Sequence, residues 1–325
     1  MEFRTELKVQ KSSWDLRHGH SVLSLGSCFA DFIGNKLEQN QFEIVSNPFG
    51  TIYNPMSIFE NLASCVEEKL IDLPAIVSSR GMFFSYRLHS EVFSESKEGL
   101  LKKIELIQEQ VSKVLSKTDY LIITLGTAWV YELNGCTVSV ANCHKMPAQT
   151  FKRRLLEVSE IVEAFTGLVQ KVKAINPNLR IITTVSPVRH IKDTLVLNSV
   201  SKSILLLACH KASQLVPDVQ YFPSFELVTD DLRDYRFYKE DLIHPNSVAL
   251  QYIWEKFREM YFSEETRLIS EDIASIYLAL QHKTLHPNSC EHEQFKKKIV
   301  EKVNKLNVKV AIPRLIEEVN LKLKY

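Results

Sequence analysis

The chain has 325 residues, of which 45% are hydrophobic and 24% charged, proportions typical of a globular protein with a substantial core. A formal net charge of +1 excludes the overall basic field of a nucleic-acid-binding protein. No run approaches about 18 apolar residues and the N-terminal stretch has no apolar signal core, so we expect a cytoplasmic protein that does not enter a membrane.

Strands and helices alternate along the predicted chain. The predicted strands are 21–27, 42–45, 119–127, 180–187 and 219–227. The predicted helices are 29–40, one from Met56, 97–116, 151–175, 195–216 and 244–262. Residues 83–94 and 128–144 have the alternating pattern of hairpins or short excursions. This order predicts a three-layer α/β/α sandwich around a parallel sheet, with ligands at the carboxyl ends of the strands.

The pattern changes after residue 262. Residues 264–283, 290–307 and 312–325 read as helices rich in Lys and Glu, without strands or clusters of site-like residues. We therefore expect a hydrolase-like domain over 1–262 and a helical extension over 263–325. The extension fits a packing role or homo-oligomerisation, and its Lys-rich face fits solvent better than a binding surface.

The six cysteines are scattered and contain no CxxC pair, so we expect free thiols. One of them, Cys28, comes directly after Ser27, which is the serine of the Gly-Ser turn that ends the first predicted strand. Ser27 is either a helix N-cap or a nucleophile, whereas Cys28 fits a small buried apolar residue.

A serine nucleophile needs a base that a third group orients, and "EDLIHPN" places Asp241 three residues before His244. A similar "LHPNS" at His286 has no carboxylate three residues earlier and fits a helix start.

These motifs together resemble the GSCFA domain family within the SGNH (GDSL-like) hydrolase superfamily. The resemblance rests on six segments over roughly residues 20–262, namely "GSCFA", "NPFGTIYNP", "TLGTAWVYE", "NCHK", "SPVRH" and "DLIHPN". It implies a flavodoxin-like sheet and ester hydrolysis or acyl transfer. Ser27 then matches the nucleophile, His244 the general base and Asp241 the residue that orients it.

The resemblance also implies an oxyanion hole. It would use the N–H of Ser27, the glycine Gly50 and an Asn in a G-x-N-D motif, but Ala128 occupies the Asn position. Asn142, at the end of the predicted hairpin, is our first choice for the missing donor, and Thr127 is the second.

Four more polar residues are candidates for binding substrate: Asn54, His144, Arg189 and His190. A role in forming a turn explains Asn54 as well as substrate binding does. His144 is suited to anchoring a loop. Arg189 and His190 are suited either to a structural role at the surface or to contact with an anion. We expect no metal, because His144 and Cys143 lack a second ligand cluster, and no cofactor.

The sequence thus favours a serine hydrolase acting on a small-molecule or carbohydrate acyl ester. Two alternatives stay open: an acyltransferase that uses the same residues, and a ligand-binding protein that keeps the fold with weak chemistry.

Overall fold

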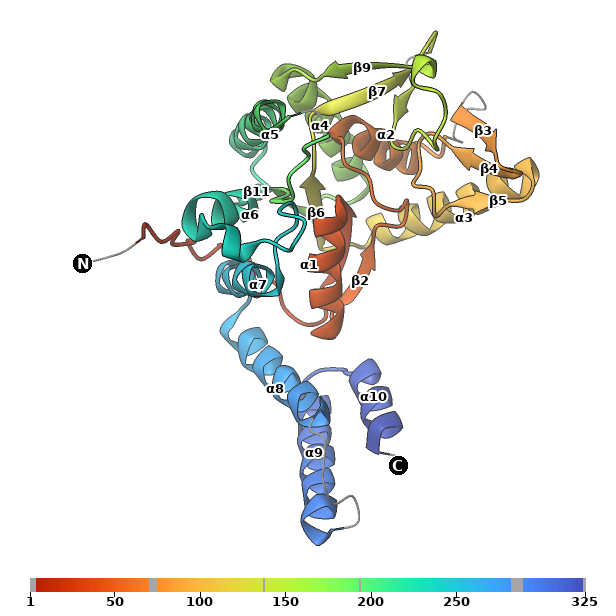
Figure 1. Cartoon of the computed structure of the whole chain (residues 1–325). Coiled ribbons are helices and arrows are strands. Elements are labelled where there is room, and N and C mark those ends of the chain that lie inside the picture. The colour runs from red at the N-terminus through yellow and green to blue at the C-terminus, as the bar shows by residue number, and fades with distance from the viewer. Residues whose placement is uncertain (1–3, 70–74, 137, 193, 282–288, 324–325) are drawn as a thin grey trace. The chain divides into compact units, whose positions relative to one another are not determined.

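A computed structural model describes residues 4–69, 75–136, 138–192, 194–281 and 289–323 (Figure 1). The chain divides into two compact units. The first comprises residues 1–8, 21–34 and 44–253, and the second 9–20, 35–43 and 254–325. This division differs from a single boundary at 262, because two N-terminal segments belong to the second unit. No helix among the described residues is both long and apolar enough to cross a membrane.

A five-stranded sheet forms the centre of the first unit. Its strands in chain order are β1 (Ser21–Gly26), β2 (Glu43–Ser46), β6 (Tyr120–Leu125), β10 (Arg180–Val185) and β11 (Val219–Phe222). The spatial order is β11-β10-β6-β1-β2, and β6 pairs in parallel with both β1 and β10. This order confirms the flavodoxin-like sheet expected of an SGNH-type hydrolase.

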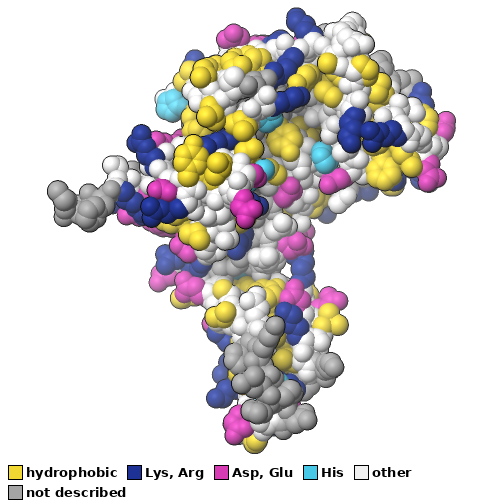
Figure 2. Space-filling view, viewed as in Figure 1, with side chains coloured by type: hydrophobic (Ala, Val, Ile, Leu, Met, Phe, Trp, Pro, Cys, Tyr) yellow, Lys and Arg dark blue, Asp and Glu magenta, His cyan; other side chains and the backbone are white. Residues whose placement is uncertain are grey.

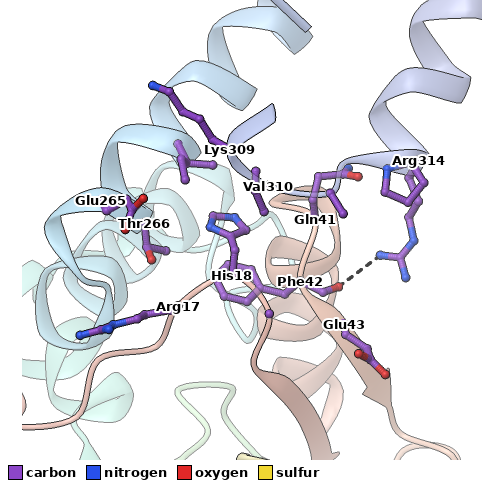
Figure 3. A pocket seen from close by; sticks show the side chains of 14 residues that line it. Arg17, His18, Gln41, Phe42, Glu43, Glu265, Thr266, Lys309, Val310 and Arg314 are labelled. Carbon is purple, nitrogen blue, oxygen red and sulfur yellow. Dashed lines mark hydrogen bonds between the residues drawn. The ribbon is translucent and has the colours of Figure 1, made fainter. Parts of the chain in front are cut away.

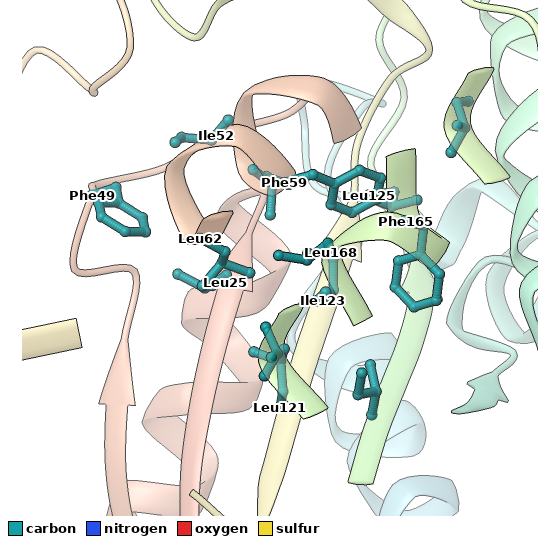
Figure 4. Close-up of a cluster of buried hydrophobic side chains, with 14 of the residues drawn as sticks. Leu25, Phe49, Ile52, Phe59, Leu62, Leu121, Ile123, Leu125, Phe165 and Leu168 are labelled. Atoms are coloured by element: carbon teal, nitrogen blue, oxygen red, sulfur yellow. The ribbon is translucent and has the colours of Figure 1, made fainter. Parts of the chain in front are cut away.

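Helices cover both faces of the sheet. They are α1 (Cys28–Gln39), α2 (Pro55–Val66), α3 (Lys97–Leu115), α4 (Val158–Ile175), α5 (Leu195–Leu215), the short α6 (Ser224–Glu226) and α7 (Ser247–Tyr261). Apolar residues of α2 to α5 pack on alternate strand residues such as Leu25 and Ile123 (Figure 4). Each such side chain contributes about 1.5–3 kcal/mol on burial. Helix α1 lies on the other face (Figure 1), where the intervening strand residues Val22 and Ile122 are also buried.

Two small antiparallel sheets accompany the central one. The first joins β3 (Ile76–Ser79), β4 (Met82–Ser85) and β5 (Phe93–Ser94), and the second joins β8 (Ser139–Val140), β7 (Trp129–Leu133) and β9 (Phe151–Leu155). The hairpin expected over 128–144 is confirmed by the pairing of β7 with β8.

The helix expected over 151–175 is wrong in its first part, because residues 151–155 form strand β9 and pair with β7. Side chains from the two strands explain this. The Arg153 guanidinium stacks 4.1 Å from the Trp129 ring centroid, and Arg154 forms a 2.7 Å ion pair with Glu132. These contacts outweigh the local preference for helix.

The C-terminal helices of the second unit are α8 (Glu264–Gln281), α9 (Cys290–Lys309) and α10 (Pro313–Leu323). Their apolar faces form one buried cluster, with Ile273 on α8, Val303 on α9 and Leu315 on α10. The helical extension expected from the sequence is thus confirmed, and a shared apolar core holds its helices together.

Candidate functional site

Gly26 ends β1 in a conformation that admits no side chain. Its φ is +136°, and a Cβ at this position would lie 2.1 Å from the carbonyl oxygen of Thr124 on β6. Its N–H donates to Asn47 Oδ1 over 2.8 Å. The chain therefore turns from strand to helix at the carboxyl edge of the sheet, where neighbouring strands also end.

Ser27 is held inside this turn. Only 1% of the residue is exposed, and its N–H donates to Thr124 O over 3.1 Å. Its Oγ accepts a hydrogen bond from the Phe29 N–H at 3.3 Å, and its carbonyl oxygen accepts from Ala30. Ser27 thus caps the N-terminus of α1, as the alternative interpretation of the sequence expects.

Cys28 is the first residue of α1 and is a free, half-buried thiol. Burial, and after it the Asp31 carboxylate, raise the pKa of the thiol. The N–H groups of Cys28 and Phe29 and the Lys202 ammonium act in the opposite direction and lower the pKa of this thiol. Cys28 therefore lies within the electrostatic influence of the buried Lys202 side chain and at the start of a helix.

Asn47 links the turn to the first turn of α1. Its Nδ2 donates to Asp31 Oδ1 over 2.6 Å, while its Oδ1 accepts from Gly26. Thr51 Oγ1 also donates to Asp31, over 3.3 Å. The loop after β2 is therefore tied to the Gly-Ser-Cys turn by side-chain hydrogen bonds.

The structure brings Asp241 and His244 together. His244 Nδ1 lies 2.7 Å from Asp241 Oδ2, and Asp241 Oδ1 accepts the N–H groups of Ile243 and His244, each over 2.9 Å. These hydrogen bonds, the backbone ones first, lower the pKa of Asp241 to about 2. The carboxylate is therefore ionised at neutral pH and fixes the imidazole, whose side chain is 41% exposed. Histidine side chains are visible on the surface drawn in Figure 2.

Arg189 anchors the loop that carries this pair. Its N–H donates to the Ile243 carbonyl and its Nη1 to the Leu242 carbonyl, both over 3.2 Å. Its guanidinium lies 4.3 Å from the centroid of the Tyr238 ring. Arg189 therefore already has a structural role, because Nη1 donates to Leu242 and the guanidinium lies over Tyr238, and the expected anion contact stays a prediction.

His190 follows Arg189 after β10. Its N–H donates to Asn198 Oδ1 over 2.7 Å, and its ring centroid lies 6.3 Å from that of Tyr53. The carbonyl of Tyr53 in turn accepts the N–H groups of Gly126 and Thr127. The loops after β2, β6 and β10 are therefore in contact at one edge of the sheet.

The N–H groups of two expected oxyanion donors, Gly50 and Thr127, are engaged in local structure. The Gly50 N–H donates to Asn47 O over 2.7 Å, and the Thr127 N–H donates to Tyr53 O over 3.1 Å. Thr127 Oγ1 lies 3.1 Å from Ser201 Oγ. Asn142 Oδ1 accepts the His144 N–H over 2.9 Å, and among the described residues no hydrogen bond joins it to Ser27. Its role as an oxyanion donor stays a prediction.

Asn54 and His144 also have structural partners. Asn54 is 5% exposed and caps α2 by accepting the Ser57 N–H over 2.8 Å. The His144 ring stacks on Phe84 with centroids 4.8 Å apart, and Nε2 lies 2.7 Å from Ser85 O. Burial lowers the pKa of His144. Both residues therefore anchor loops, which is the structural alternative for each, and substrate contact by either stays a prediction.

Lys202 is a site residue that sequence reasoning missed. The side chain, on α5, is 1% exposed and donates to Gly126 O and Ser186 O, both over 2.7 Å. Burial lowers its pKa to about 7. A signal was present in the sequence: Lys202 lies on the stripe of α5 that also contains buried Asn198, Leu205 and Cys209.

The second unit contains a pocket of about 670 Å3 (Figure 3). Two of its charged lining residues form ion pairs: Arg314 contacts Glu38 and the Phe42 carbonyl, and Arg17 contacts Asp15. His18 stacks on Phe42 with centroids 4.6 Å apart. None of the candidate catalytic residues lines this pocket, and the alternative site His286 lies outside the described residues.

The chain can now be placed among known proteins. The GSCFA family matches residues 21–257, and the C-terminal domain of GSCFA domain proteins matches 273–325. The chain belongs to the GSCFA family. The first match includes the Gly-Ser-Cys turn and the Asp241–His244 pair, so the family covers the whole candidate site. None of the curated proteins matches the chain.

Two solved structures are similar to this GSCFA chain at 11% identity. One is described as a candidate platelet activating factor from Streptococcus pneumonia, with a TM-score of 0.38 over 75% of this chain and 84% of that one. The other is a carbohydrate esterase family 3 protein from Talaromyces cellulolyticus, with a TM-score of 0.37 over 78% and 99%. Likeness at this level assigns no activity to the chain.

Proposed function

We propose that this GSCFA protein is a carboxylic-ester hydrolase that forms an acyl-enzyme intermediate on Ser27, in the Gly26–Cys28 turn. The observation that carries the proposal is the 2.7 Å hydrogen bond between His244 and Asp241, in a loop whose carboxylate is fixed by two backbone N–H groups. A carboxylate on Nδ1 holds the other ring nitrogen, Nε2, as a proton acceptor, which is the arrangement of a general base in acyl transfer.

In this mechanism each group has one task. His244 removes the proton from the nucleophile and returns it to the leaving alcohol, and Asp241 stabilises the imidazolium that forms between these steps. An N–H group at the start of α1 donates to the carbonyl oxygen as it gains negative charge. The substrate class is a small-molecule or carbohydrate acyl ester.

Acyl transfer to a second alcohol is the alternative outcome for the same residues. Hydrolysis and transfer share the acyl-enzyme and differ only in whether water or another hydroxyl accepts the acyl group. Product analysis with and without a sugar acceptor separates them. A ligand-binding protein without efficient chemistry would turn over neither reaction.

A panel of acyl esters, varied in chain length and alcohol, tests the proposal. We expect His244→Ala and Asp241→Asn to lower kcat at least about 10²-fold on every ester that the wild type hydrolyses. His210→Ala, an exposed histidine on α5, is the matched control and should keep wild-type turnover. Equal turnover in wild type and His244→Ala would contradict the assignment of the base.

A further inference from the structure

We propose that Leu242, which lies between Asp241 and His244, is a specificity-determining residue that contacts the alcohol half of the ester. A leucine offers an apolar contact, so the proposal names an alkyl or aryl ester, and not a sugar ester, as the substrate class. It rests on the proposed function, in which His244 is the base. Leu242 is not among the site residues expected from the sequence.

The backbone of Leu242 is the first observation. Its φ is +57°, and of the eight non-glycine residues with a positive φ in the described chain it is the only apolar one. Its N–H donates to Lys239 O over 2.9 Å, which closes a tight turn. This left-handed conformation is strained for a residue with a Cβ, and Gly, Asn or Asp adopts it more easily. A leucine at this position therefore lowers the stability of its own turn.

Burial offsets only part of this strain, because Leu242 is 50% exposed. The turn is instead held by polar contacts. Asp241 Oδ1 accepts the N–H groups of Ile243 and His244, and Arg189 Nη1 donates to the Leu242 carbonyl over 3.2 Å. Strained residues that their surroundings hold in place cluster at functional sites. A contact with bound substrate explains this exposed leucine better than a contribution to stability does.

A second exposed apolar side chain lies beside the same arginine. The Arg189 guanidinium is 5.0 Å from the centroid of the Tyr235 ring, and Tyr235 is 58% exposed. The same guanidinium donates to Leu242 O. Arg189 therefore contacts both the turn that carries the base and an exposed aromatic ring. Exposed apolar groups beside polar catalytic groups are typical of ligand-binding grooves.

The chemistry of the base determines which half of the ester meets Leu242. His244 returns its proton to the leaving alcohol oxygen, so this oxygen must come within about 2.6–3.2 Å of the imidazole. The carbon chain on that oxygen is then next to the turn 239–244. The acyl chain, in contrast, extends from the carbonyl carbon that Ser27 attacks. Since Leu242 is two residues from His244 in this turn, we assign its contact to the alcohol half.

Two series of esters test the assignment with the full chain. The acetates of ethanol, butan-1-ol and hexan-1-ol vary the alcohol, and the ethyl esters of acetic, butyric and hexanoic acid vary the acyl group. Because a fully buried CH2 group is worth up to about fourfold in kcat/KM, we expect the wild type to prefer hexyl to ethyl acetate by at least about tenfold. In Leu242→Asn this preference should fall below about threefold, while the acyl series responds as in the wild type.

Two further variants are controls. Leu242→Met keeps an apolar side chain and should retain the preference for hexyl acetate. Leu106→Asn makes the matched change at an exposed leucine of α3 and should behave as the wild type. An equal loss of kcat/KM on all esters in Leu242→Asn would indicate a structural role and overturn the inference. A loss confined to the acyl series, or a wild type that prefers acetylated glucose to hexyl acetate, would also overturn it.

Stability and product binding keep the inference testable if no ester is turned over. Asn tolerates a positive φ, so Leu242→Asn should unfold at the wild-type temperature or up to about 4 °C above it. A clear fall in Tm would mean that the leucine stabilises the fold, and would overturn the inference. An NMR titration measures the Kd of hexan-1-ol, which we expect to be at least about fivefold higher in Leu242→Asn than in the wild type. Equal affinities would overturn the contact, whereas the expected difference without turnover of any ester would support the contact and contradict the proposed ester chemistry.

Discussion

Lys202 is a charged side chain that the fold places in the interior, at the ends of two strands. Its ammonium satisfies the carbonyls of Gly126 and Ser186, which follow β6 and β10. Two hydrogen bonds replace only part of the hydration that an ammonium has in water, so burial disfavours its charged form. Burial therefore lowers the pKa of Lys202 to about 7.

Replacing Lys202 by methionine should change how stability depends on pH. The pKa of Lys202 is lowered from its usual 10.5 to about 7 in the folded protein. Between these values the unfolded chain binds a proton that the folded chain has lost, so the free energy of unfolding should rise with pH over this window. In Lys202→Met this contribution is absent. Urea denaturation from pH 7 to about 9.5 measures both slopes, and parallel curves for the two proteins would contradict a neutral buried amine.

At the scale of elements, the join between β1 and α1 determines where the candidate nucleophiles stand. Gly26 lets β1 run against β6 and then turn, and Asn47 ties the same point to the loop after β2. The adjacent cap at Ser27 starts the helix directly after the strand. Small changes in this join would move Ser27 and Cys28 relative to the carboxyl edge of the sheet.

Gly26→Ala should therefore destabilise the protein. The added Cβ would meet the Thr124 carbonyl at 2.1 Å and would force a φ of +136° on a residue with a side chain. We expect a loss of more than about 2 kcal/mol of unfolding free energy. Gly167→Ala in α4, with nothing within 4 Å of its Cβ, should instead gain about 0.5–1 kcal/mol. Similar unfolding midpoints for the two variants would show that the turn tolerates a side chain.

Much of the fold could be predicted from the sequence because its strands are apolar runs between helices of clear period. β6 is an example: all six of its residues are buried, and its largely apolar sequence YLIITL is typical of a buried strand. β9 was missed because "FKRRLLE" favours helix locally, and only its pairing with β7 makes it a strand. A contact between residues distant in sequence decided this element, and periodicity does not report such contacts.

Of the candidate site, the sequence could predict the contact between neighbouring residues but not the hydrogen bonds made by residues of the surrounding loops. The three-residue spacing of Asp241 and His244 predicted their contact correctly. For the oxyanion donors, residue type does not reveal that the N–H groups of Gly50 and Thr127 already donate to nearby carbonyls, or that Asn142 Oδ1 accepts the His144 N–H. The sequence favoured Ser27 over Cys28 as the nucleophile, but it does not report how far each side chain is exposed, and in the structure Ser27 is 1% exposed and Cys28 is half-buried.

At the scale of the whole molecule, each compact unit has its own buried core. In the second unit the core lies among α8, α9 and α10, and Ile273 is 1% exposed within it. On the same helix Leu278 is 71% exposed. Truncating Ile273 and Leu278 in turn therefore distinguishes the loss of buried packing from the loss of an exposed side chain on the same helix.

Ile273→Ala should destabilise the second unit by about 2–5 kcal/mol, because it removes buried methyl groups and leaves a cavity. Leu278→Ala should change its stability by no more than about 0.5 kcal/mol. Urea denaturation followed by circular dichroism, which reports the helices lost, measures both. If the exposed leucine proves as costly as the buried isoleucine, the packing of these helices is not the one described.

The claim that one turn carries the acyl group is tested most directly by trapping it. Wild-type protein is quenched with acid during turnover of an activated acyl ester, digested with trypsin and analysed by mass spectrometry. The account predicts one added acyl group on the segment 18–36, located at Ser27 by fragmentation. An acyl group on a segment outside 18–36, or turnover with no acylated protein under conditions where the acyl-enzyme should accumulate, would contradict it.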